Sequence, residues 1–181
     1  MFARDPASGE LHFVEARQDT AADALARPRD LAISPDGAHL YAISRGDNAL
    51  AVLGRNADTG RLTPIDQLAD PATGIDGLVG LASALTLSPD GAQLYVTSLI
   101  GAVAVLARDA GSGRLSVLEA HRDGENGIAG LAAATDVVVS PDGADVYALG
   151  RIGAVGDAAV TVFRRDLAPE GSPTRVASSR D

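Results

Sequence analysis

The chain has 181 residues, of which 46% are hydrophobic and only 3% aromatic, and it carries a formal net charge of −9. All 15 basic residues are arginines and they are scattered, so the basic surface that nucleic acids and anionic lipids require is missing, and neither is expected as a partner. The sequence has no cysteine, which excludes disulfides and thiolate metal sites. The start MFARDPASGE lacks the apolar core of a signal peptide, and no apolar stretch approaches the roughly 20 residues of a membrane helix, so neither is expected and the compartment stays open.

The first predicted elements are short strands. Segment 1–19 contains one apolar run, ELHFVEA at 10–16, which predicts a single strand. Segment 20–70 contains four runs of strand length that are rich in β-forming residues and bounded by Gly, Pro, Asp or Ser. These runs lie at 30–34, 39–44, 49–54 and 61–68. None shows the 3.6-residue period of a helix, so four antiparallel strands are expected.

Two strings show that this four-strand unit is repeated. The first, SPDGA, begins at Ser34, Ser88 and Ser140. The second follows the third strand of each unit, as ARDPASG at 3–9, GRNADTG at 54–60, ARDAGSG at 107–113 and, more loosely, RRDLAPEG at 164–171. A period of about 50 residues is typical of a solenoid or a propeller.

The predicted fold is therefore all-β and of the β-propeller type, with about three four-stranded antiparallel blades plus one extra N-terminal strand. The blades are assigned to 20–70, 71–123 and 124–181, the last with a weak outer strand, and 1–19 is a partial blade. In each SPDG turn, proline presets φ at the second position and glycine supplies the positive φ that returns the chain into the next strand. The structural turn residues are Pro35, Gly37, Pro89, Gly91, Pro141 and Gly143.

The repeated strings resemble the YVTN-type repeats of bacterial lactonase-like β-propellers, the group that includes 6-phosphogluconolactonase-like proteins. The strings that carry the resemblance are SPDGAQLYVTS at 88–98, VAVLARDAGSGRL at 103–115 and VTVFRRD at 160–166. The resemblance extends over all three units and implies blades throughout, in a family that commonly has about seven. The matching residues are turn and core residues, so no catalytic residue is carried over.

Antiparallel alternation divides the loops between two faces. The SPDG turns and the turns after the third strands lie on one face, which repeats nearly unchanged and suits a structural role. The other loops form a variable face, where a ligand is expected. The candidate ligand-binding residues on the variable face are Arg45, Asp47, Asp76, His121, Glu125 and Arg151. An arginine there would hold an anionic group and His121 or Glu125 would activate water, but no spacing of nucleophile, base and orienting group supports catalysis.

Other conspicuous residues have structural explanations. His12 and His39 align with polar residues of the other units and are expected at the surface. One tyrosine recurs in the second strand of each unit and is expected to pack between blades, namely Tyr41, Tyr95 and Tyr147. The acidic stretch 123–127 lacks the alternating oxygen ligands of a calcium loop, so no metal is expected, and no motif predicts a cofactor.

Three functions are consistent with these features. The chain is a noncatalytic propeller module that binds a ligand or partner through its variable face, or a piece of a longer propeller, or, by resemblance, a lactone hydrolase. The sequence favours the first two because it contains no recognisable catalytic set. Three blades cannot close a ring, since propellers need about four or more. The expected partners are therefore the remaining blades of a longer chain or a second copy, head to tail, with the N-terminal strand completing the last blade.

Overall fold

The computed structural model describes residues 2–5, 7–16, 25–69, 82–152, 157–166 and 176–178. Throughout these ranges the chain consists of β-strands joined by turns and contains no helix, which confirms the predicted all-β, propeller-type fold. Within the same ranges there is consequently no helical segment that is long and apolar enough to cross a membrane.

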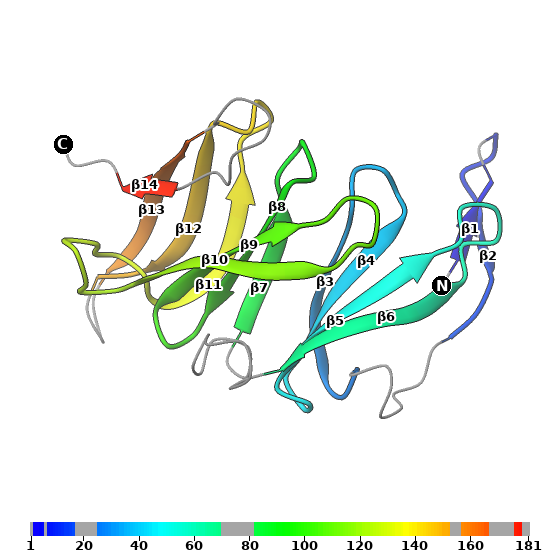
Figure 1. The fold of residues 1–181 in the computed structure, drawn as a ribbon, viewed down its shortest axis with the longest axis horizontal. Helices are drawn as coiled ribbons and strands as arrows, with labels where there is room; N and C mark the ends of the chain where they lie inside the picture. The colour runs from blue at the N-terminus through cyan, green and yellow to red at the C-terminus, as the bar shows by residue number, and fades with distance from the viewer. Residues whose placement is uncertain are drawn as a thin grey trace.

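In the described part of the chain, the strands form three four-stranded antiparallel sheets, which we call blades 1, 2 and 3. Blade 1 comprises β3 (Pro28–Ile33), β4 (His39–Ser44), β5 (Ala49–Arg55) and β6 (Leu62–Ala69). Blade 2 comprises β7 (Ala82–Leu87), β8 (Gln93–Ser98), β9 (Ala102–Arg108) and β10 (Leu115–Arg122). Blade 3 comprises β11 (Ala132–Val139), β12 (Asp145–Arg151), β13 (Ala158–Arg165) and β14 (Val176–Ser178). The blades stand side by side in chain order, as Figure 1 shows.

The N-terminal segment differs from the prediction of a single strand. It forms a two-stranded antiparallel hairpin of β1 (Phe2–Arg4) and β2 (Leu11–Phe13). The reason lies in the string at 3–9, where the Asp5 carboxylate accepts the backbone N–H groups of Ala7 and Ser8 and closes a tight turn. This turn folds the first residues back onto β2, and the hairpin lies beyond blade 1 at one end of the molecule (Figure 1).

The SPDG turns have the predicted geometry. Gly37, Gly91 and Gly143 have φ of 71°, 69° and 74°, the left-handed region in which glycine carries no steric penalty. In blade 1 the Gly37 N–H donates to the Ser34 carbonyl, and the Asp36 carboxylate accepts the Ser34 hydroxyl and the Ala38 N–H. The same bonds recur in blades 2 and 3, so each turn is locked by its own side chains.

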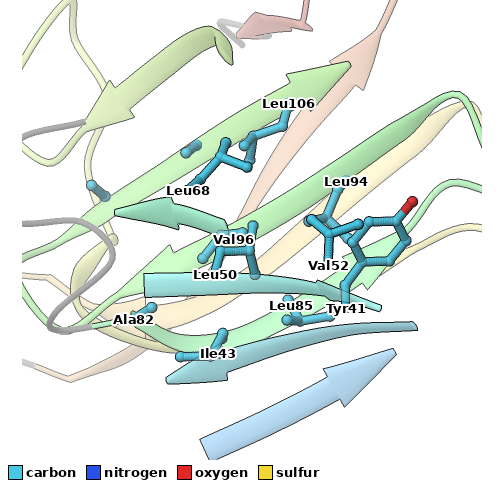
Figure 2. Packing of buried hydrophobic residues seen from close by; sticks show 12 residues of the cluster. Tyr41, Ile43, Leu50, Val52, Leu68, Ala82, Leu85, Leu94, Val96 and Leu106 are labelled. Atoms are coloured by element: carbon cyan, nitrogen blue, oxygen red, sulfur yellow. The ribbon is translucent and has the colours of Figure 1, made fainter. Parts of the chain in front are cut away.

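The hydrophobic core lies between the blades. Side chains of blade 1 pack against the facing side of blade 2 in one cluster. Figure 2 labels ten residues of this cluster from the two blades: Tyr41, Ile43, Leu50, Val52, Leu68, Ala82, Leu85, Leu94, Val96 and Leu106. A second cluster joins blades 2 and 3 around Tyr95, Val105 and Phe163. The middle strands of blade 2 are buried on both faces because each face is covered by a neighbouring blade, which explains their nearly continuous apolar sequences.

Candidate functional site

Two candidates of the variable face, Asp47 and Arg45, hold loops in place. The Asp47 carboxylate accepts the backbone N–H of Ala26 at 2.7 Å and the hydroxyl of Ser44 at 2.9 Å, which ties the loop after β4 to the segment before β3. The Arg45 Nε donates to the carbonyl of Ala82 in blade 2 at 3.2 Å. Both side chains therefore make contacts that a structural role explains.

His121 lies within β10 and not in the following loop, where the sequence placed it. Its ring packs 5.2 Å from the ring of Phe163 in blade 3, and its Nε2 lies 3.5 Å from a carboxylate oxygen of Glu119. The Nε2 atom is buried and has no hydrogen-bond partner among the described residues. His121 thus contributes to the contact between blades 2 and 3 more than to an open binding surface.

The remaining candidates do not assemble with these three. Glu125 lies in an exposed turn after β10, and Arg151 is exposed at the end of β12. Asp76 lies outside the described residues. Among the residues that the structure describes, no hydrogen bond or ion pair joins any two of the candidates, and no cluster of His, Asp and Glu is arranged to hold a metal ion.

The most connected polar site lies on the repeated face, where sequence reasoning expected only turns. Arg108, at the end of β9 in blade 2, reaches across to blade 1 and is almost completely buried. Its guanidinium donates to the Asp36 carboxylate at 2.7 Å, to the Tyr41 hydroxyl at 2.8 Å and to the Gly91 carbonyl at 3.1 Å. One Nη also lies 2.9 Å from Nδ1 of His39. We call this arrangement the first arginine clamp.

A second arginine clamp joins blade 3 to blade 2 at the equivalent position. Arg165, at the end of β13, donates to the Asp90 carboxylate at 2.6 Å, to the side-chain oxygen of Gln93 at 2.6 Å and to the Gly143 carbonyl at 3.3 Å. The Tyr95 hydroxyl donates to the same oxygen of Gln93 at 2.6 Å. In both clamps, an arginine of one blade is bound by the SPDG turn of the blade before it.

The clamps correct one prediction from the sequence. His39 was expected at the surface with its counterpart Gln93, yet the two are only 6% and 2% exposed. They are buried because the turn of the following blade packs over them. In the first clamp, for example, Gly113 lies so close to the His39 ring that an added Cβ would overlap it. The signal that sequence reasoning missed is the arginine that recurs at a fixed place after the third strand.

The electrostatics of the first clamp favour fixed charges over proton transfer. The Ser34 hydroxyl holds the pKa of Asp36 far below its usual range, and the Ala38 N–H and Arg108 add to this effect. Burial lowers the pKa of His39, and the positive charge of Arg108 lowers it further. At neutral pH the clamp therefore contains a charged Arg–Asp pair and a neutral histidine, which suits a structural link.

The tyrosines of the clamps are protonated hydrogen-bonding groups. Burial raises the pKa of Tyr95 to about 12, and burial also raises the pKa of Tyr41. A tyrosine with a raised pKa is a poor base or nucleophile at neutral pH. The Tyr41 hydroxyl instead donates to the Gly113 carbonyl at 2.8 Å while it accepts from Arg108.

With this geometry established, the comparisons with known proteins identify the fold. The sequence model of the family described as "Lactonase, 7-bladed beta-propeller" matches residues 1–75. A Bacteroides uniformis protein described as a candidate 6-phosphogluconolactonase aligns with 97% of the chain at a TM-score of 0.66 and 20% identity. The periplasmic gluconolactonase of Pseudomonas aeruginosa aligns with 97% of the chain at a TM-score of 0.61 and 23% identity. The chain has a lactonase-like β-propeller fold.

This lactonase-like propeller spans about half the length of the solved structures that it matches. It covers 49% of the Bacteroides uniformis protein and 48% of the Pseudomonas aeruginosa protein. A Lactobacillus plantarum protein gives the same picture, with a TM-score of 0.67, 19% identity, 95% of this chain aligned and 48% of its own length covered. No curated protein matches the chain in sequence.

Proposed function

We propose that the chain is a noncatalytic, lactonase-like propeller module that binds a sugar acid or its lactone on the variable face. One observation carries the noncatalytic part. Arg45, Asp47 and His121, half of the candidates for a reactive site, are engaged in contacts that hold loops and blades together. The exposed charges of Arg151 and Glu125 remain for ligand contact.

The names of the similar proteins support the proposed ligand class. Proteins described as gluconolactonase and candidate 6-phosphogluconolactonase share this blade arrangement, and their names refer to sugar lactones. A sugar acid is anionic at neutral pH and a sugar lactone presents several hydroxyls, so an exposed arginine and a carboxylate are suitable partners for them. Arg151 is accordingly the residue we assign to the anionic end of the ligand.

Lactone hydrolysis is the second candidate function. It is supported by the family description and by the printed names of the similar structures. Hydrolysis would require Glu125 to activate water and Arg151 to stabilise the developing oxyanion. Both side chains are exposed on the variable face, so each can be changed with little effect on stability.

One pair of measurements separates the two functions. Binding of 6-phosphogluconate is measured by calorimetry, and ring opening of gluconolactone and its 6-phosphate by proton release, against the spontaneous rate. We expect saturable binding that weakens in Arg151→Ala, and no acceleration of ring opening. The matched control is Arg114→Ala, another exposed arginine but on the repeated face. Acceleration that disappears in Glu125→Gln would establish the hydrolase instead, and the absence of both binding and turnover would overturn both functions.

A further inference from the structure

The outer side of blade 3 has the pattern of an inter-blade contact without a covering blade. In blade 1, the pairs Ile43–Leu50 and Tyr41–Val52 lie opposite each other on β4 and β5 and face blade 2. The equivalent pairs on β12 and β13 of blade 3 are Leu149–Val160 and Tyr147–Val162. Ile43, Leu50 and Val52 of blade 1 are 0%, 2% and 0% exposed, whereas the equivalent Leu149, Val160 and Val162 of blade 3 are 43%, 62% and 41% exposed. An apolar surface of this kind on a soluble protein indicates an interaction site.

The same side of blade 3 also presents half of an arginine clamp. Asp142 is equivalent to Asp36 and Asp90, and its carboxylate accepts the Ser140 hydroxyl and the Ala144 N–H in the same way. Among the described residues, however, no arginine donates to Asp142, and the Tyr147 hydroxyl has no partner. A hollow of about 140 Å³ on this side of blade 3 is lined by Tyr147, Leu149 and Val160, among others.

Blade 1 presents the complementary half. Arg55 is equivalent to Arg108 and Arg165. Each of these three arginines donates from Nη1 to the carbonyl of the SPDG glycine in its own blade, and for Arg55 this bond to Gly37 is 3.2 Å long. Within the described ranges, its other N–H groups have no carboxylate partner. Beside it, Leu31 is 64% exposed, although the equivalent Leu85 of blade 2 is 6% exposed. The middle strands on this side of blade 1 are covered within the chain itself, since Ala49, Ala51 and Leu53 are only 1%, 0% and 1% exposed.

We propose that blade 1 of a second copy of this chain docks on the outer side of blade 3, with its Arg55 bound to Asp142 and Tyr147. Charge complementarity argues for this occupant, because the chain itself carries an unmatched arginine and an unmatched carboxylate at equivalent positions of one repeated contact. Two copies joined head to tail by this contact would form a ring of six blades with two identical seams. Six blades fall within the range in which propellers close.

The N-terminal hairpin is not the closing element in this arrangement. At the outer edge of blade 3, β14 already pairs with residues 163–165 of β13, the position that the N-terminal strand was expected to fill. Leu11 and Phe13 of the hairpin are 64% and 66% exposed, and the Glu15 carboxylate that follows the hairpin accepts the Leu62 N–H of blade 1. The docked copy would displace the hairpin, which lies beside blade 1 (Figure 1), together with the residues that now cover Ala49, Ala51 and Leu53.

The first test is the mass of the full chain in solution, by light scattering and sedimentation at micromolar concentration. We expect a species of twice 18.3 kDa. Arg55→Gln and Asp142→Asn should each weaken the dimer at least tenfold, since Asn at 142 keeps the oxygen that its own turn uses and loses only the charge. Matched controls are Arg114→Gln and Asp58→Asn, which change exposed charges elsewhere. A folded monomer, or a dimer unaffected by both variants, would overturn the proposal.

A mixing experiment tests the pairing itself. In each variant alone, both seams of the ring lack one partner of the Arg55–Asp142 pair. In a mixture of Arg55→Gln with Asp142→Asn, one of the two seams contains an intact pair, so the mixture should form more dimer than either variant alone. Circular dichroism confirms that both variants are folded. Removal of residues 1–16 should leave the dimer intact, and a mixture that behaves as the average of its components, or a dimer lost on this truncation, would contradict the proposed contact.

Discussion

The two seams between blades are built on the same Arg–Asp pair and differ in the group beside it. Between blades 1 and 2, Arg108 donates to a tyrosine hydroxyl and lies against a histidine nitrogen. Between blades 2 and 3, Arg165 donates to Gln93, which also accepts the tyrosine hydroxyl. The difference teaches that the guanidinium and the turn carboxylate define the contact, while the buried group beside them is interchangeable as long as it offers an acceptor.

The largest effect should come from removing a clamp arginine. Arg108→Met should lower the free energy of unfolding by about 3 kcal/mol, because it leaves the buried Tyr41 hydroxyl and a turn carbonyl without their donor and Asp36 without its cation. Arg165→Met should have a similar effect at the other seam. The matched control is Arg55→Met, with an expected loss of about 0.5 kcal/mol or less, because Arg55 makes one carbonyl contact. Urea denaturation measures all three, and equal losses would show that the inter-blade contacts contribute little.

A methyl group on Gly113 should have the next largest effect. The added Cβ would overlap the His39 ring and would also occupy a φ of 73°, so Gly113→Ala should cost about 2 kcal/mol. Gly124→Ala is the control, since Gly124 has φ of 79° with open space around it and should cost about 1 kcal/mol. In a His39→Ala background, where the ring is absent, Gly113→Ala should cost only about as much as Gly124→Ala does. If its cost is unchanged there, the close approach of Gly113 to His39 is wrongly assigned.

The SPDG glycines of blades 1 and 2 differ in what surrounds them, because Gly91 lies against Pro35 of the preceding blade and Gly37 lies only near Arg55 of its own blade. Both Gly37→Ala and Gly91→Ala should cost about 1 kcal/mol, because both positions require positive φ. Of the two, Gly91→Ala should lower stability more. Its Cβ would lie 3.2 Å from the Arg108 guanidinium and from Pro35 of blade 1, whereas a Cβ on Gly37 would lie 3.7 Å from Arg55. Thermal melts rank the variants. If neither melts earlier than the wild type, the turn assignment is wrong.

The smallest expected effect is a pH dependence of stability that arises from His39 at the first seam. The pKa of His39 is lowered in the folded protein, so on acidification below about 6.5 the unfolded chain takes up a proton that the folded chain resists. Stability should therefore decrease between about pH 7 and pH 5, and His39→Gln, which copies the second seam, should reduce this dependence. His12→Gln, at an exposed histidine, is the control. Unfolding free energies with the same slope in His39→Gln and wild type would contradict the burial of this ring.

The turn carboxylates affect stability at a lower pH than His39 does, because their pKa values are lowered. Asp36 and Asp90 both have pKa values below the ordinary 3.8; burial opposes the lowering at Asp90, and the Ser88 hydroxyl, the Ala92 N–H and Arg165 outweigh it. The stability that these carboxylates contribute is present above about pH 4 and is lost only as they become protonated in more acidic solution. The histidine effect can therefore be measured without interference from the clamps' ion pairs.

The sequence by itself determined the strands and turns of each blade, because these depend on residues that are close together in the chain. Strand length, the β-forming residues of the apolar runs and the proline and glycine of the SPDG turns act within a few residues, and the positive φ of Gly37, Gly91 and Gly143 follows from the turn sequence. The expectation of a single N-terminal strand was wrong because residues 2–4 form too short a run to predict a strand, although the local Asp5 turn folds them back onto β2.

Only the tertiary structure decided what the polar residues do. Arg108 and Asp36 are 72 positions apart, and no local pattern reveals that the arginine of one blade binds the turn of the blade before it. His39 looked like a surface residue because its neighbours in sequence form a polar turn, yet the following blade covers it. In the same way Arg45, Asp47 and His121 were expected to face a ligand on the variable face, and the structure places them in contacts that hold loops and blades together. The physical reason is that a blade's core and clamps exist only between blades, so burial and pairing depend on which blade comes next in space.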